Sequence, residues 1–343
     1  MSDAVTSARR PASIAWTGPL ALVLLVVLSA LAAMRIGPLP AFGPLLDPVG
    51  GLWSVARQAA DPSPDVAVIP TLEGEVEVVI DARGVPHIYA DTVPDAMRAL
   101  GYMQAVDRLF QLELQVRATA GRLTELVGEA ALPLDRQQRR LGLAWSAERA
   151  WRELASADDP DRILYEALAE GINARIDSLG RSDLPFEYHF LGRRPARWVP
   201  VNSLLIGKRM AYTLSYGAED LWRLRAEGLV GRAAADALYP VDSPLQQPIQ
   251  PNGSPMPREL AHRVPPPAPR DAALTRRADA LVAAVPPPAD VPRGMVLGSN
   301  NWAVAASRTA GAGALLAGDP HLNLTLPSIW YEVHLVVPGA LDV

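Results

Sequence analysis

The chain has 343 residues, of which 49% are hydrophobic and 20% charged, so it is long enough for two domains and apolar enough to bury a sizeable core. Its formal net charge of -5 gives it no general attraction for nucleic acid, and we expect no nucleic-acid partner. The sequence contains no cysteine, which excludes disulfides, thiolate metal sites and cysteine nucleophiles.

Residues 1–35 have the features of a membrane anchor or a signal segment. Arg9 and Arg10 precede an uncharged stretch from Ile14 to Met34, which is long enough to cross a hydrocarbon layer of about 30 Å as a helix. The same features describe a signal peptide with a cleavage site near residues 30–32, and a buried core helix is a third interpretation. The length of the stretch favours the anchor. With either an anchor or a signal, we expect the rest of the chain in the cell envelope, membrane-anchored or periplasmic.

Residues 65–241 are predicted to be rich in helix. The region opens with strand-like stretches at Val76–Ile80 and Val85–Tyr89, which flank turn residues and predict a hairpin. From Val93 the apolar residues recur at a helical period, and Glu113 and Arg117 are spaced to pair across the exposed face of that helix. Further helices are expected at residues 143–154, 155–179 and 201–238.

Residues 242–298 are rich in proline and predict a solvated spacer, because such a segment cannot bury enough apolar surface to order itself. After the spacer the chain changes to strand character. Stretches 302–305 and 314–317 flank a glycine turn, the leucines of 322–326 alternate with polar residues, and 329–337 is an apolar run. A helical block, a spacer and an abrupt change to strands indicate that two chains are made from one.

Several short motifs occur in a definite order along the chain. Those before the spacer are Gly84–Ile88, Gly101–Leu109 with Gln111 and Glu113, Gly121–Glu125 with Gly128, and Leu191–Pro195 with Trp198 and Pro200; those after it are Gly298–Trp302 and Gly318–His321. In residues and in order they resemble the motifs of the penicillin acylase family, the first group those of its α-subunit and the second those of its β-subunit. The resemblance implies an α/β (α+β) fold of the N-terminal-nucleophile class, with a four-layer αββα core, a helix-rich α-subunit and a β-subunit that begins at Ser299 and is incomplete here.

The resemblance implies that Ser299 attacks the carbonyl of Gly298 and that the peptide bond breaks after an N-to-O acyl shift. Glycine tolerates the distorted backbone that such an attack needs. Cleavage frees the α-amino group of Ser299, whose reference pKa of about 7.7–8.0 suits a base for its own hydroxyl. No triad and no catalytic cofactor are then required, and Gly-x-Ser-x-Gly and His-Glu-x-x-His motifs are absent from the sequence. We expect an α/β heterodimer, made from one precursor, that hydrolyses a penicillin-like or N-acyl amide.

Two further residues match family positions near the nucleophile or a metal. His321 matches a histidine or glutamine that orients the serine and binds substrate, and the alternative is a histidine on a strand face. Glu219 resembles a glutamate that helps to bind a structural calcium ion, which requires several oxygen ligands. Its alternative is a solvated glutamate at a helix start.

Three apolar residues resemble wall positions of the acyl pocket, with core packing as the alternative for each. His87 and Asp107 belong to matching motifs, but we interpret both as structural. The wall residues are Met210, Leu214 and Leu322, and the histidines to which we assign no role are His189, His262 and His334.

The resemblance also implies that the oxyanion-hole donors and the other calcium ligands lie beyond Val343. Each such donor contributes about 10²–10³ in rate, so we expect this chain by itself to be inactive and to be part of a longer product. The rival hypothesis is a membrane-anchored binding protein on the same scaffold that has lost catalysis. The intact pair of Gly298 and Ser299 argues against that rival.

Overall fold

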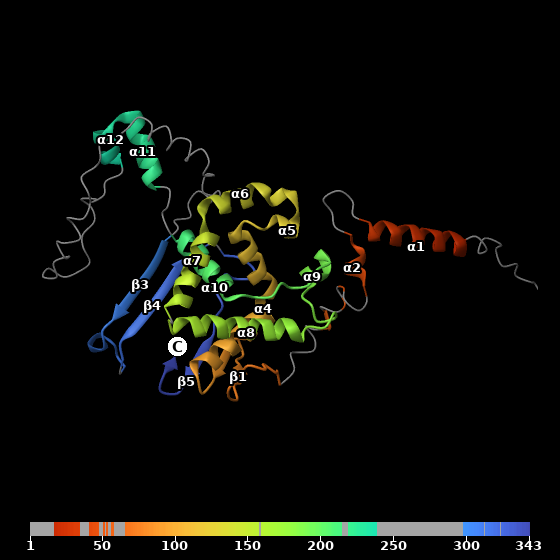
Figure 1. Cartoon of the computed structure of the whole chain (residues 1–343), viewed down its shortest axis with the longest axis horizontal. Coiled ribbons are helices and arrows are strands. Elements are labelled where there is room, and N and C mark those ends of the chain that lie inside the picture. Colours follow the sequence, from red (N-terminus) through yellow and green to blue (C-terminus); the bar gives the residue numbers. More distant parts are fainter. Residues whose placement is uncertain are drawn as a thin grey trace, which may run out of the picture. The chain divides into compact units, whose positions relative to one another are not determined.

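The computed structural model describes residues 17–34, 41–47, 51, 53, 56–57, 66–157, 159–214, 219–238, 298–311, 313–322 and 324–343. They belong to two compact units, Met1–Arg209 with Pro327–Val343 and Met210–Leu326. Helices and strands are mixed (Figure 1), which confirms an α+β class, while the four-layer core stays a prediction. The predicted spacer (242–298) lies outside the described residues apart from Gly298.

The elements are α1 (Thr17–Ala33), α2 (Gly43–Leu46), β1 (Glu77–Ile80), β2 (Pro86–Tyr89), α4 (Val93–Ala120), α5 (Thr124–Val127), η2 (Glu129–Ala131), α6 (Leu132–Leu141), α7 (Leu143–Ser156), α8 (Asp161–Ser178), α9 (Phe186–Leu191), α10 (Pro200–Thr213), α11 (Glu219–Val230), α12 (Arg232–Leu238), β3 (Gly298–Val304), η3 (Ala306–Arg308), β4 (Leu315–His321), β5 (His334–Val337) and β6 (Leu341–Asp342).

The apolar stretch near the N-terminus forms helix α1, which has 17 residues. Within the described part of the chain, no helix is both long and apolar enough to cross a membrane. The predicted membrane-spanning anchor is therefore not supported. The signal-segment interpretation stays a prediction, and residues 1–16 lie outside the described ranges.

Strands β1 and β2 form the predicted antiparallel hairpin. Its turn is held by the Asp81 carboxylate, which accepts hydrogen bonds from the backbone nitrogens of Arg83 at 2.8 Å and Val85 at 2.9 Å. The sheet order is β1-β2-β5-β6, and β5 joins β2 in parallel, with His87 opposite His334. A strand that follows the spacer thus completes the sheet that opens the folded region.

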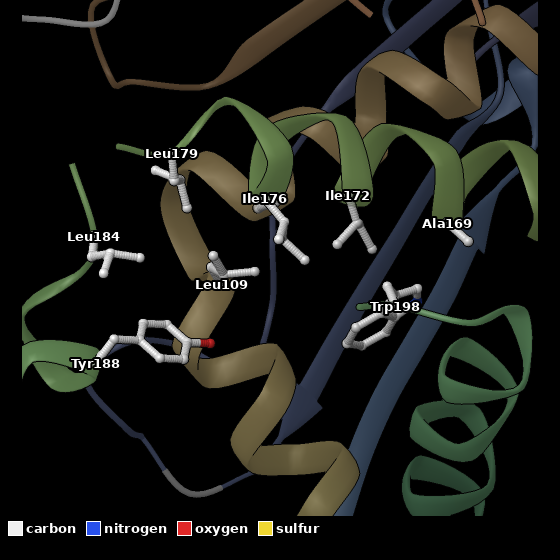
Figure 2. Close-up of a cluster of buried hydrophobic side chains, with 9 residues drawn as sticks. Leu109, Ala169, Ile172, Ile176, Leu179, Leu184, Tyr188 and Trp198 are labelled. Atoms are coloured by element: carbon white, nitrogen blue, oxygen red, sulfur yellow. The ribbon is translucent and has the colours of Figure 1, made fainter. Parts of the chain in front are cut away.

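Helices α4 and α8 cross so closely that glycine is needed at the contact. A Cβ at Gly171 would lie 1.8 Å from the carbonyl oxygen of Arg98, and a Cβ at Gly101 would lie 2.2 Å from that of Leu168. The close approach brings α8 over a buried apolar cluster that also receives side chains from α9 and from the segment before α10 (Figure 2). The buried members are Ala105, Leu109, Ala169, Ile172, Ile176, Leu179, Leu184, Tyr188 and Trp198.

Glu113 pairs with Arg117 as predicted, at 2.8 Å, but the predicted exposure of this pair is wrong. Only 7% of Glu113 is exposed, because α9 and the segment after it cover this face of α4. Its carboxylate accepts hydrogen bonds from the Tyr188 hydroxyl at 2.7 Å and from the Ala196 backbone nitrogen at 3.3 Å. Burial, together with the adjacent Glu113 carboxylate, raises the pKa of the Tyr188 hydroxyl. The family motif here therefore builds a buried polar network.

Three sequence-based expectations about elements need correction. The helix expected over residues 201–238 is divided into α10, α11 and α12, and the strand expected over 329–337 is confined to β5. No strand forms in the described residues of 322–326, where Leu324 and Leu326 are fully exposed. Alternating polarity is not sufficient for a strand, because the backbone also needs a neighbouring strand to accept and donate its hydrogen bonds.

Candidate functional site

The predicted cleavage site lies at the start of β3, which pairs antiparallel with β4. The register places Gly298 opposite His321 and Ser299 opposite Pro320. A hairpin whose turn contains η3 therefore brings the two predicted catalytic residues to the same end of one ladder, although they are distant in the sequence. Ser299 is exposed, and so is most of β3.

The side chains of Ser299 and His321 point to opposite faces of this two-stranded sheet. Side chains alternate between the faces along a strand, and directly opposed residues share a face. His321 is opposite Gly298, so its imidazole lies on the face of Asn300 and not on that of Ser299. The Ser299 hydroxyl is thus separated by the sheet from the imidazole but is close to its own backbone nitrogen. The catalytic role of His321 stays a prediction.

His321 has two polar neighbours that we had not singled out from the sequence. Its Nε2 atom lies 2.7 Å from Asp319 Oδ2 and 3.5 Å from Asn300 Nδ2. When Nε2–H donates to the carboxylate, Nδ1 of the neutral ring is left as an acceptor. The two-residue spacing of Asp319 and His321 on one strand is the signal that would have placed both side chains on one face.

The remaining predicted site residues lie on α10 or directly after it, on α11 and after β4. Met210 and Leu214 are one helical turn apart, and the Leu214 backbone nitrogen donates to the Met210 carbonyl at 2.9 Å. Leu322 is half-buried directly after β4, and Glu219 is the first residue of α11, although its side chain is outside the described part. Among the described residues, no group of three or more histidines and carboxylates could hold a metal ion. The calcium role of Glu219 therefore stays a prediction.

Two motif residues that we interpreted as structural both contact the segment after the spacer. The Asp107 carboxylate accepts a hydrogen bond from the Tyr331 hydroxyl at 2.7 Å, and the Nδ1 atoms of His87 and His334 are 2.9 Å apart. Burial and the Asp107 carboxylate raise the pKa of the Tyr331 hydroxyl. His334 was given no role from the sequence, because its partner is set by strand pairing and lies far away along the chain.

A family model described as penicillin amidase matches residues 75–343. The chain is 37% identical over 268 residues to the penicillin acylase 2 proenzyme of Pseudomonas sp. (strain SE83), and the matched region covers 78% of this chain and 33% of that protein. It is 30% identical over 310 residues to the acyl-homoserine lactone acylase QuiP of Pseudomonas aeruginosa, over 89% of this chain and 35% of that protein. The chain thus spans about a third of the length of these curated relatives.

A solved structure of a thermostable penicillin G acylase from Alcaligenes faecalis is similar to 52% of this chain and 97% of that chain. The sequence identity is 26% and the TM-score is 0.44.

Proposed function

The chain belongs to the penicillin amidase family, and on this premise we propose that it carries the nucleophile of an acylase that hydrolyses linear amides. Ser299 is the proposed nucleophile. The observation that carries the proposal is the ladder of β3 and β4, which holds the Gly298–Ser299 bond at an exposed strand start, with His321 at the paired position.

Maturation begins when the Ser299 hydroxyl oxygen attacks the carbonyl carbon of Gly298. The C–N bond breaks as the acyl group moves to the hydroxyl oxygen, and the nitrogen takes up the hydroxyl proton, which frees the α-amino group of Ser299. Water then hydrolyses the resulting ester, which releases the chain that ends at Gly298 and restores the Ser299 hydroxyl. In turnover the same oxygen attacks the substrate amide, the amine leaves with a proton, and water releases the acyl group. We propose the α-amino group as the base because the side chains of Ser299 and His321 point to opposite faces of the two-stranded sheet.

The proposed substrates are small N-acyl amides. Relatives named penicillin acylase and acyl-homoserine lactone acylase support a penicillin-like or N-acyl amide as the substrate. The product of maturation is an α/β heterodimer with the four-layer core of the N-terminal-nucleophile class. Met210, Leu214 and Leu322 are the proposed wall positions of its acyl pocket.

Maturation can be tested by N-terminal sequencing of the purified protein and of its Ser299→Ala variant. In the full-length protein we expect the chain on the C-terminal side of the cut to begin Ser-Asn-Asn-Trp-Ala and the variant to stay uncut. The matched control is Ser307→Ala, which changes an exposed serine of η3 in the same unit and should be processed normally. Normal processing of Ser299→Ala would overturn the proposal.

The identity of the base is tested by the pH dependence of kcat/KM. We expect kcat/KM to fall as the pH drops through one ionisation of the free enzyme, and we expect His321→Gln to keep that acid limb. A His321→Gln protein that matures and binds substrate but has lost the acid limb and turnover would make the imidazole the base. Binding of an N-acyl amide with no turnover in the wild type would instead support the non-catalytic rival.

A further inference from the structure

The segment after the spacer is held to the region before it by specific contacts within one compact unit. Strand β5 pairs with β2, and Leu335 and Val337 are buried in the apolar clusters that include α4 residues. Outside the strands, Gln111 Nε2 donates to the Ser328 carbonyl at 3.0 Å. If the chain is cut at Ser299, contacts of this kind hold the two products together.

One polar contact lies on the other face of this sheet, between the neighbouring strands β2 and β5. His87 and His334 are directly opposed, their rings are nearly perpendicular at 85°, and their Nδ1 atoms are 2.9 Å apart. The outer nitrogens face carboxylates: His334 Nε2 lies 2.9 Å from Asp342 Oδ1, and His87 Nε2 lies 3.7 Å from Asp81 Oδ2. Both imidazoles are about two-thirds buried, with 28% and 34% of their side chains exposed.

The number of protons that this contact tolerates follows from the geometry. Two Nδ1 atoms at hydrogen-bond distance share one proton, so one ring donates and the other accepts. With His334 Nε2–H donating to Asp342, His87 is the Nδ1 donor and both rings are neutral. A first added proton goes to His87 Nε2, next to Asp81, and leaves the shared hydrogen bond intact.

A second added proton has a different effect, because it must occupy the accepting Nδ1 of His334. Two N–H groups would then face each other at the short Nδ1–Nδ1 distance, each on a positively charged ring. The hydrogen bond is lost and is replaced by repulsion between like charges. Histidine side chains in general change charge between about pH 5 and 8, and this is the pH range in which the contact is to be tested.

We propose that the His87–His334 contact is an acid-sensitive clasp between the region before the spacer and the strand that follows Ser299. The clasp is closed while the pair carries at most one positive charge and opens when it carries two. It joins two separate chains only after the proposed cleavage at Ser299, so in that respect it rests on the proposed function.

The other ionisable and charged groups around the pair come from the hairpin turn, from β1 and β2, and from the segment around β5. Arg83 binds Asp81 and reaches Glu332 at 3.2 Å, and the Tyr89 ring packs edge-on against His334 at 6.2 Å between centroids. A hydrogen bond from the Val85 backbone lowers the pKa of Asp81, which favours the charged form of this carboxylate. The full set is Glu77, Asp81, Arg83, Tyr89, Glu332 and Asp342.

Hydrogen exchange of the β2 and β5 amides between pH 7 and pH 5, corrected for intrinsic rates, tests the clasp in the processed protein. The open state binds one more proton than the closed state. The equilibrium constant for opening, and with it the corrected exchange rate, should therefore increase by about tenfold for each pH unit below the pH at which the open pair takes up its second proton. His334→Gln, which can hydrogen-bond but cannot titrate, should show no such slope.

The matched control is Glu332→Gln, which removes the exposed Arg83–Glu332 ion pair between the same segments but keeps both histidines. It should retain the wild-type slope. His87→Gln repeats the test if His334→Gln does not fold. A wild-type protein without a slope, or a glutamine variant that keeps it, would overturn the clasp. The uncut Ser299→Ala protein should show the same slope, so failure of maturation and failure of the clasp are separately observable.

Discussion

The helical region around α4 and the hairpin of β3 and β4 both carry family motifs, but their motif residues differ in burial and in hydrogen bonding. In the helical region the motif residue Glu113 is buried, and its carboxylate accepts hydrogen bonds from a tyrosine, an arginine and a backbone nitrogen. In the hairpin Ser299 is exposed, and the contacts of His321 with Asp319 and Asn300 lie at the surface. A motif by itself thus does not show whether its residues are buried in the scaffold or exposed, whereas the tertiary structure does.

The comparison predicts that substitutions in the helical region cost stability, whereas those in the hairpin change activity and leave stability nearly unchanged. The largest effect is expected for Gly171→Ala, because its new methyl group would overlap the Arg98 carbonyl. Overpacking of this kind typically costs about 1–3 kcal/mol, and we expect the upper end because the obstacle is backbone. Urea unfolding measures the change.

The control for that substitution is Gly207→Ala in α10, where a Cβ would meet no atom within 4 Å. Alanine favours a helix over glycine, so the control should gain up to about 1 kcal/mol. Equal losses in the two variants would mean that the close crossing of α4 and α8 does not determine stability.

The next largest effect is expected for Glu113→Gln. The variant loses the negative charge that faces Arg117 and changes an acceptor in a buried network. An unsatisfied buried polar group costs about 1–3 kcal/mol, which should appear as a lower free energy of unfolding at pH 7. Glu153→Gln breaks the exposed Arg149–Glu153 pair and should cost less than about 1 kcal/mol. The prediction fails if the two variants lose the same stability.

A smaller and pH-dependent effect is expected for Asp135→Asn. Burial by itself would raise the pKa of Asp135, but hydrogen bonds from Thr124 and Leu123 hold it below its usual value. A carboxyl whose pKa is depressed in the folded state stabilises the protein above its unfolded pKa, and this contribution disappears as the pH falls through the folded pKa. The stability difference between wild type and variant should therefore be present at pH 7 and shrink below about pH 4. A difference that does not change with pH would contradict this assignment.

The smallest effect on stability is expected for His321→Gln. Its ion pair with Asp319 is exposed, and exposed substitutions usually change the free energy of unfolding by less than about 0.5 kcal/mol. The same variant should change the rate or the substrate preference of the mature enzyme. A loss of more than about 1 kcal/mol would show that residues of the hairpin contribute to stability as those of the helical region do, and would contradict the difference predicted between the two regions.

Local patterns were enough to predict several elements. The turn residues after Ile80 predicted the hairpin of β1 and β2, and the helical period from Val93 predicted α4. The alternation over 322–326 failed, because that pattern describes two faces but does not supply a neighbouring strand. The apolar stretch near the N-terminus predicted a helix correctly, but among the described residues no helix is long and apolar enough for the expected membrane span.

The sequence by itself determined the family, the opening hairpin and the long helix after it, and Ser299 as the candidate nucleophile, because motifs and periodicity are local properties of the chain. Only the tertiary structure decided that Glu113 is buried, that Ser299 and His321 face apart, and that His87 meets His334 across neighbouring strands. These facts depend on which distant segments cover a face or pair in a given register. A register shift of one residue turns every side chain of a strand to the other face, and no local pattern records that choice.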